Sequence, residues 1–279
     1  MNKISITTII ENHSDVDNKY ISEHGLSLLI KTKEMNILFD TGQTNNFFKN
    51  MKAMNIDYNS INKVILSHGH YDHTGGICAL LEKAKNIETV YVGDNFFNKK
   101  YKLKDDNTYA YNGIKFSEES LYKLNNNIEK IKDNRKIINK ELIIFHNFKS
   151  NNDFEKLNKK FYINKNNEYI LDNFQDEIAL GIVTKKGLVL IVGCSHIGII
   201  NIINSVKSEI NIPIRGIIGG THLVDADEYR LKDTINKLKK LNLEFLAVSH
   251  CTGDNNIDIL KQEFKDKFII NNTGNVIEL

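Results

Sequence analysis

Short runs of alternating apolar and polar residues open the chain and predict strands, because successive side chains of a strand point to opposite faces of a sheet. These runs cover Ile4–Ile10, Leu26–Thr32 and Asn36–Asp40. The next segment, Asn45–Met54, has the spacing of a helix instead. Farther on, the apolar triplet Val64–Leu66 is typical of the end of a buried strand. The opening part therefore predicts a β-rich half in which helices begin to alternate with strands.

The second half of the chain repeats this order of strands and helices. Two apolar runs predict a hairpin that turns at Lys185-Lys186, and spaced isoleucines mark the buried stripe of a helix that begins at Ile199. The remaining pattern predicts strands over Ile214–Gly219, Glu244–Ser249 and Phe268–Ile270, and helices over Glu228–Leu241 and Ile257–Phe264. Two similar halves with helices outside predict an α/β fold, a four-layer αββα sandwich.

The stretch between the halves differs in composition. Residues 96–165 contain 15 Lys and one Arg against nine Asp or Glu, a local balance of +7, whereas the whole chain has +2. The expected organisation is one domain over 1–279, with halves at 1–94 and 179–279 and an insertion at 95–178 that includes a helical Ser117–Ile131. The insertion is either a basic lid that attracts an anionic substrate through Lys99, Lys100 and Lys102, or a solvated surface.

Composition excludes several classes of protein. No apolar run approaches the roughly 20 residues of a membrane-spanning helix, and the first residues lack a secretory signal. No nucleic-acid-binding motif accompanies the modest charge. Three cysteines argue against a disulfide framework and for the cytoplasm. Two of them, Cys194 and Cys251, stand beside candidate ligands and are either buried thiols or thiolate ligands.

The run from Ser67 to Gly76 is the most informative stretch for chemistry. Directly after a predicted buried strand, it places three imidazoles and one carboxylate within six positions: His68, His70, Asp72 and His73. Imidazole nitrogen and carboxylate oxygen suit zinc, and also iron or manganese. A metal site is therefore expected in this loop.

Four loop residues cannot complete the coordination of two ions, so later segments must supply more donors. Three apolar runs in the second half each end on candidates, namely Cys194 and His196, His222, and His250. Side chains at successive strand ends lie along one edge of a sheet, where α/β folds assemble their sites. These residues are thus expected to complete the metal coordination that begins in the loop from His68 to His73.

These motifs resemble those of the metallo-β-lactamase superfamily, whose first landmark matches Leu38–Gly42 and whose second is the histidine loop. The resemblance implies the αββα fold and two divalent ions, with Zn²⁺ preferred over iron or manganese. It also implies the site residues. The first ion would be bound by His68, His70 and His196, the second by Asp72, His73 and His250, and Asp40 would orient the loop by hydrogen bonding.

One landmark of that superfamily is missing. Most members have an aspartate that bridges both ions, but here Gly220-Thr221-His222 stands in its place, and the nearest acids, Asp225 and Asp227, come later. Three roles stay open for His222: a metal ligand, a hydrogen-bond partner of the substrate, or a structural residue. The number of ions bound stays open with them.

A narrower resemblance points to one subgroup, the 7,8-dihydropterin-6-methyl-4-(β-D-ribofuranosyl)aminobenzene-5'-phosphate synthases. It is carried by five strings, which start at Glu23, Asp176, Gly193, Gly219 and Ser249. Within these strings, His24 is expected to line the site, and Glu177 to act as a base or as a partner of the ligands.

The expected activity follows from the metals. A metal-bound hydroxide would attack a phosphorylated or otherwise anionic small molecule, with Asp72 taking the proton and His222 assisting as a second catalytic residue. This makes the protein a metal-dependent hydrolase. The alternatives are the transferase reaction of the synthase subgroup, which releases pyrophosphate, and a metal-containing sensor without turnover. Neither nucleic acid nor membrane is expected as a partner, and a homo-oligomer stays open.

Overall fold

The chain is described by a computed structural model over residues 4–125 and 127–279, and it divides into two compact units. Unit 1 comprises Met1–Lys130, Lys159–Asp172 and Asn272–Leu279. Unit 2 comprises Ile131–Asn158 and Asn173–Asn271. The middle of the chain is therefore shared between the units.

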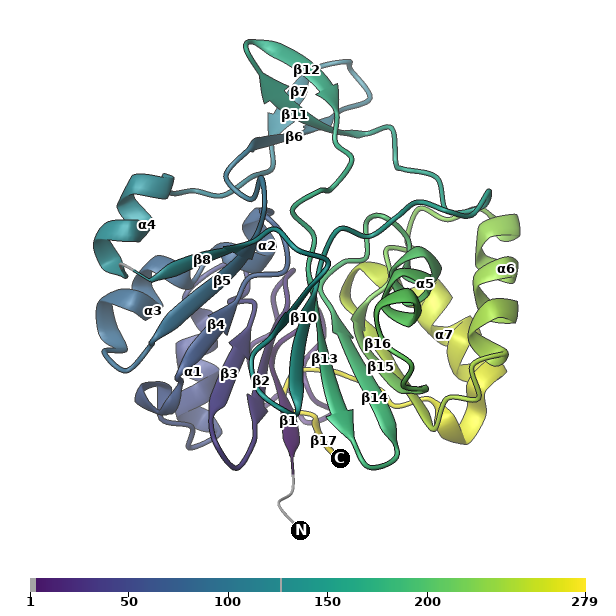
Figure 1. The fold of residues 1–279 in the computed structure, drawn as a ribbon, viewed down its shortest axis with the longest axis horizontal. Coiled ribbons are helices and arrows are strands. Elements are labelled where there is room, and N and C mark those ends of the chain that lie inside the picture. The colour runs from purple at the N-terminus through teal and green to yellow at the C-terminus, as the bar shows by residue number, and fades with distance from the viewer. Residues whose placement is uncertain (1–3, 126) are drawn as a thin grey trace. The chain divides into compact units, whose positions relative to one another are not determined.

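Unit 1 is built on a seven-stranded sheet in the order β17-β1-β2-β3-β4-β5-β8 (Figure 1). The strands are β1 (Ser5–Ile10), β2 (Ser27–Lys31), β3 (Asn36–Phe39), β4 (Lys63–Ile65), β5 (Thr89–Gly93), β8 (Ile128–Ile131) and β17 (Val276–Glu278). Neighbours β3, β4 and β5 run parallel. Because parallel strands share one carboxyl edge, the segments after β3 and β4 meet there.

The longer helices of unit 1 bury their apolar sides against this sheet. They are α1 (Asn46–Ala53), α2 (Tyr71–Thr74), α3 (Ile77–Lys83) and α4 (Glu118–Leu124), with a short 3₁₀ turn η1 (Tyr58–Ser60). Phe47 of α1 and Leu80 of α3 are fully buried in one cluster with Leu38 and Val64 of the sheet. This cluster fixes the end of β4, from which the histidine loop starts.

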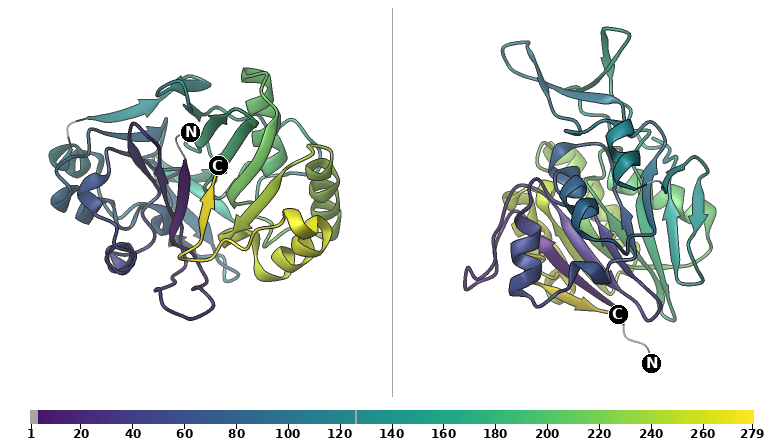
Figure 2. Two further views of the ribbon diagram at one scale, coloured as in Figure 1. Left: turned by 90° about the horizontal axis from the view of Figure 1, so that it is seen from below. Right: turned by 90° about the vertical axis from the view of Figure 1, so that its left-hand side faces the viewer.

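A separate four-stranded sheet belongs to unit 1 and stands away from its larger sheet (Figures 1 and 2). Its order is β12-β11-β6-β7, with β6 (Lys99–Leu103), β7 (Tyr109–Tyr111), β11 (Phe161–Lys165) and β12 (Glu168–Leu171). All its neighbours pair antiparallel. We call it the small sheet.

Unit 2 is built on a six-stranded sheet in the order β16-β15-β14-β13-β10-β9. Its strands are β9 (Arg135–Ile137), β10 (Leu142–Phe145), β13 (Ala179–Thr184), β14 (Gly187–Val192), β15 (Ile214–Gly220) and β16 (Phe245–Ser249). Its helices are α5 (Ile199–Glu209), α6 (Glu228–Lys239) and α7 (Asp254–Phe264), with 3₁₀ turns η2 (His250–Thr252) and η3 (Lys265–Lys267). Leu190, Ile203, Leu238 and Leu260 share its core.

Strands β14, β15 and β16 run parallel and lie side by side. Their carboxyl ends therefore lie along one edge of the sheet, and the segments that follow them carry Cys194 and His196, His222, and His250 in turn. This is the arrangement that the apolar runs of the second half predicted. The predicted hairpin is present as well, as the antiparallel pair β13–β14.

Two predicted elements are wrong. Phe268–Ile270 is not a strand: Phe268 makes only an isolated bridge to Leu246, and the last strand, β17, pairs with β1. The predicted helix over Ser117–Ile131 ends at Leu124, and β8 follows it. The stretch expected as one insertion is divided between the units, because β8 belongs to the large sheet of unit 1 whereas β9 and β10 belong to the large sheet of unit 2.

None of the helices within residues 4–125 and 127–279 is both long and apolar enough to cross a bilayer.

Candidate metal centre

The histidine loop of unit 1 runs from the end of β4 into the single-turn helix α2 and gathers four donor side chains. All four are at least 94% buried: His68, His70, Asp72 and His73. His68 Nε2 lies 3.0 Å from His70 Nδ1, and His73 Nε2 lies 3.6 Å from Asp72 Oδ2. Burial lowers the pKa of His68 well below its usual range, and the neighbouring His73 and His70 act in the same direction. A neutral imidazole is the form that binds metal.

Asp40, directly after β3, organises this loop. Its Oδ1 accepts the backbone N–H of Ser67 at 2.7 Å, and its Oδ2 accepts both the Ser67 hydroxyl and His73 Nδ1, each at 2.7 Å. Because an ionised carboxylate can only accept hydrogen bonds, His73 carries its proton on Nδ1. Its Nε2 keeps the lone pair with which an imidazole binds a metal ion. Asp40 and His73 have no exposed side-chain surface.

Three further contacts support the loop from within unit 1. His24 Nε2 lies 3.3 Å from Asp72 Oδ2, so the structure brings this predicted residue to the loop. The ring of Phe161, on β11, packs against His70 with centroids 5.5 Å apart. His70 also forms an isolated bridge with Gly113. The small sheet and the segment after β7 thereby support His70.

The three candidate substrate lysines lie on β6, and one of them differs from the prediction. Lys100 is buried and its Nζ lies 2.6 Å from Asp172 Oδ2, which makes an ion pair with both side chains at least 97% buried. Burial of a charge requires such a partner, so Lys100 acts in structure and not as an accessible cation. Lys99 and Lys102 are exposed.

In unit 2, the segment after β14 is held through its backbone. The Glu177 carboxylate accepts the N–H of His196 at 2.8 Å and that of Ile197 at 3.2 Å. Burial raises the pKa of Glu177 to about 8, although these two N–H donors act in the opposite direction. Phe174 stacks on the His196 ring, with centroids 4.1 Å and planes 2° apart.

The segments after β15 and β16 are tied to each other. Thr221 and Thr252 share a hydrogen bond of 2.9 Å between their hydroxyls. The backbone N–H of His222 donates to Cys251 Sγ at 3.3 Å, and the His222 ring lies 4.3 Å from that of His196.

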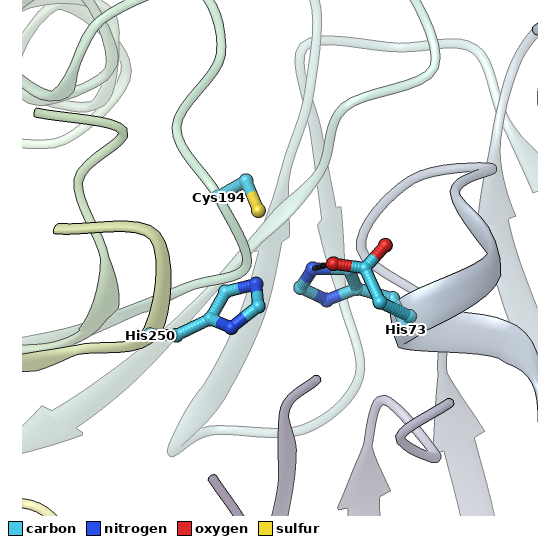
Figure 3. A group of neighbouring side chains, drawn as sticks. His73, Cys194 and His250 are labelled. Carbon is cyan, nitrogen blue, oxygen red and sulfur yellow. Dashed lines mark ion pairs between the residues drawn. The ribbon is translucent and has the colours of Figure 1, made fainter. Parts of the chain in front are cut away.

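Figure 3 places the labelled donors on their elements. Within unit 2, Cys194 projects from the segment after β14, and His250 from the start of η2 after β16. Within unit 1, His73 projects from α2, and the dashed line marks the 3.6 Å approach of its Nε2 to Asp72 Oδ2. Each unit thus presents imidazole together with thiol or carboxylate, which are ligands that fit a divalent transition metal.

The residues at these strand ends have unusual backbone conformations. Asp40, Ser195, His222 and His250 have φ of 60°, 59°, 46° and 54°, and Phe174 has 51°. A residue other than glycine in this left-handed region costs about 1–3 kcal/mol, and such residues cluster at functional sites. The strain supports a functional centre at both strand edges.

The sequence prediction missed three residues. Ser67 lies at the start of the stretch from Ser67 to Gly76 but no role was predicted for it, although its hydroxyl links Asp40 to the loop. Phe161 packs at a tilt against His70 and Phe174 stacks on His196, both from distant positions in the sequence, and no local pattern marks them.

A family model for the Metallo-beta-lactamase superfamily matches residues 23–162, half of the chain. The chain belongs to this superfamily. The predicted α/β fold of the metallo-β-lactamase type is thereby confirmed, and the match covers Asp40 and the whole histidine loop.

Individual relatives agree with this. The 7,8-dihydropterin-6-methyl-4-(beta-D-ribofuranosyl)-aminobenzene-5'-phosphate synthase of Methanocaldococcus jannaschii is 34% identical over 100% of this chain and 97% of its own, which confirms the subgroup resemblance. Tm1679, described as a metal-dependent hydrolase of the beta-lactamase superfamily, is 29% identical, with a TM-score of 0.85 over 99% of both chains. Zn²⁺-bound PqqB from Methylobacterium extorquens shares the fold alone, at 9% identity, a TM-score of 0.62 and coverage of 99% of this chain and 100% of its own.

Proposed function

We propose that this protein is a metal-dependent hydrolase of a phosphorylated or otherwise anionic small molecule. The observation that carries the proposal is the buried histidine loop, in which Asp40 fixes the tautomer of His73 and leaves Nε2 as a donor. A buried cluster of imidazoles beside a carboxylate is costly for a fold unless it binds something.

The ligand assignment is a proposal from the superfamily pattern and the chemistry of the donors. His68, His70 and His196 would bind one divalent ion, and Asp72, His73 and His250 the other, with zinc preferred. Bound ions supply Lewis acidity, which polarises a phosphoryl or carbonyl oxygen and makes water a better nucleophile.

The residues of the chain supply position and proton transfer. Asp72 takes the proton of the attacking water, and His24, 3.3 Å from its Oδ2, stabilises the carboxylate in the required orientation. Asp40 and Glu177 hold the two ligand loops so that the donor atoms need not reorganise during the reaction.

The anionic character of the substrate is inferred from charge. Lys99 and Lys102 are exposed on the small sheet of unit 1, on the segment with the local balance of +7. Exposed cations of this kind raise the local concentration of an anionic ligand and act at long range.

The test is hydrolysis of an aryl phosphodiester by protein loaded with zinc or manganese. We expect turnover by the wild type and none by His68→Ala, while His13→Ala, which removes an exposed histidine of the same unit, retains it. Equal activity in wild type and His68→Ala would contradict the proposal.

A second candidate function is favoured by the 34% identity to the Methanocaldococcus jannaschii synthase over the full length of this chain. In that transferase reaction, the ring carbon of an arylamine ribotide attacks the methylene group of a pterin pyrophosphate, and pyrophosphate leaves. Release of pyrophosphate only when both substrates are present would support the synthase. Release from the pterin pyrophosphate alone would support the hydrolase.

A further inference from the structure

Unit 2 contains a second group of metal-binding side chains with a softer character. Cys194, His222 and Cys251 are at least 92% buried. One ligand atom from each, two sulfurs and an imidazole nitrogen, lies within 4.8 Å of the others. They come from the ends of β14, β15 and β16, three neighbouring parallel strands of one sheet.

We propose that Cys194, Cys251 and His222 form a zinc site of their own, with two thiolates and one imidazole. In tetrahedral zinc the Zn–S bonds are about 2.3 Å and Zn–N bonds about 2.0–2.1 Å, so neighbouring donor atoms stand about 3.5–3.8 Å apart. The three donor atoms lie at most 4.8 Å apart, which exceeds that spacing by about 1 Å. Two thiolates beside imidazole select zinc over magnesium or calcium.

The backbone around the cluster is shaped for these thiols. A Cβ on Gly220 would lie 2.5 Å from Cys251 Sγ, so only glycine leaves room for the sulfur. The N–H of His222 already donates to Cys251 Sγ at 3.3 Å, a bond that stabilises a thiolate. The Cys251 thiol donates to the carbonyl of Cys194 at 3.4 Å, and this bond is exchanged for the metal bond.

Binding replaces the proton of each thiol by the ion, so two protons are released for each zinc bound. The ion would then join the ends of β14, β15 and β16, which carry His196, His222 and His250. It would also explain why His222 stands where most members of the superfamily have a bridging aspartate: His222 serves the thiolate site.

The test uses Co²⁺ as a spectroscopic substitute for zinc in the full chain. We expect a thiolate-to-cobalt charge-transfer band in the near ultraviolet for the wild type. Cys194→Ser and Cys251→Ser should each lose at least half of its intensity, and His222→Ala should weaken cobalt binding at least tenfold. Cys78→Ser is the matched control, because Cys78 lies in unit 1 outside the cluster, and it should keep the full band.

The double variant His68→Ala/His70→Ala separates this site from the proposed catalytic one, because it should keep the band while losing hydrolysis. A wild type without the band would overturn the proposal, and so would a band that keeps more than half of its intensity in Cys251→Ser or disappears in the double variant. Zinc-edge X-ray absorption of the wild type covers the case in which the variants fail to fold. It should detect sulfur at about 2.3 Å, and a first shell of nitrogen and oxygen alone would overturn the proposal.

Discussion

The two units carry their donor side chains in different ways. In unit 1, four donors fall within six consecutive positions of one loop, so the sequence alone identifies them as a group. In unit 2, the donors come from three segments that only the parallel order of β14, β15 and β16 brings together. We call the two groups the half-sites of the proposed metal centre: the group in unit 1 is encoded locally, and the group in unit 2 is encoded by topology.

The two half-sites are also held differently. Asp40 holds the side chain of His73, which fixes the direction of one donor atom. Glu177 accepts hydrogen bonds from the backbone N–H groups of His196 and Ile197, which fixes the path of the chain. The orientation of the His196 ring is then set by its packing against Phe174. Substitutions of these two carboxylates should therefore act on different quantities.

The largest effect should come from removing donors of one unit at a time. His68→Ala/His70→Ala and His196→Ala/His250→Ala should each abolish hydrolysis and leave at most the ion of the Cys194–Cys251–His222 site, because loss of two ligands weakens metal binding by more than the roughly 10- to 100-fold that loss of an outer partner costs. Elemental analysis and the phosphodiester assay measure both. Full metal content and activity in the second variant would mean that unit 1 alone binds the ions.

A large effect on stability is expected at Lys100, which supports the unit 1 half-site through the small sheet. Lys100→Met leaves Asp172 buried without its cation, which should cost about 3–5 kcal/mol of unfolding free energy. Lys100→Met/Asp172→Leu should recover most of that loss. Lys102→Met, on the same strand but exposed, is the control and should change the unfolding free energy by less than about 0.5 kcal/mol. Urea unfolding measures all three, and equal losses for Lys100→Met and Lys102→Met would contradict the argument.

The same contrast between local and topological information explains which elements could be predicted from the sequence. Strands β1 to β3 and helices α5 to α7 follow from their own residues, since the strands are almost wholly buried within a large sheet and each helix buries one face against a large sheet. Phe268–Ile270 is as apolar as a strand, but it has no full partner in the described structure. Val276–Glu278, with Val276 52% exposed, shows no clear alternation and becomes a strand only because β1 pairs with it.

Contacts between residues distant in sequence could not be predicted, either at the ends of elements or around the candidate site. The predicted helix over Ser117–Ile131 ends early because the Asn127 amide donates to the Glu88 carbonyl and the Thr89 hydroxyl, and β8 begins at the next residue beside β5. The ion pair of Lys100 and the stacking of Phe174 on His196 join residues distant in sequence, so no local pattern contains them.

A smaller effect on metal binding should separate the two supporting carboxylates. Asp40→Asn should weaken metal binding about 10- to 100-fold, because an amide has one acceptor oxygen and its NH2 group would face either the Ser67 N–H or the His73 Nδ1–H. Glu177→Gln should weaken it less, since the amide oxygen still accepts the N–H of His196. Competition with a chromophoric chelator measures both affinities, with the exposed Asp258→Asn as control. A larger loss of affinity in Glu177→Gln than in Asp40→Asn would contradict the distinction between a carboxylate that fixes a side chain and one that fixes the backbone.

The smallest effect is a pH dependence that belongs to unit 2. Burial raises the pKa of Glu177 from 4.5 to about 8, so between these values the folded state keeps a proton that the unfolded state has lost. The folded state then binds more protons, and the unfolding free energy contributed by Glu177 falls as pH rises, by at most about 1.4 kcal/mol per pH unit. Below pH 4.5 both states are protonated and above 8 both are ionised, so the contribution is flat outside this window.

Glu177→Gln removes this proton and should flatten the curve between pH 5 and 8 in metal-free protein, whereas Glu168→Gln, at an exposed site of unit 1, should leave the slope unchanged. Urea unfolding at four pH values in the presence of chelator gives the slopes. Parallel curves for wild type and Glu177→Gln would show that the two N–H donors keep the carboxylate ionised in the folded state, so that both half-sites would rest on charged carboxylates.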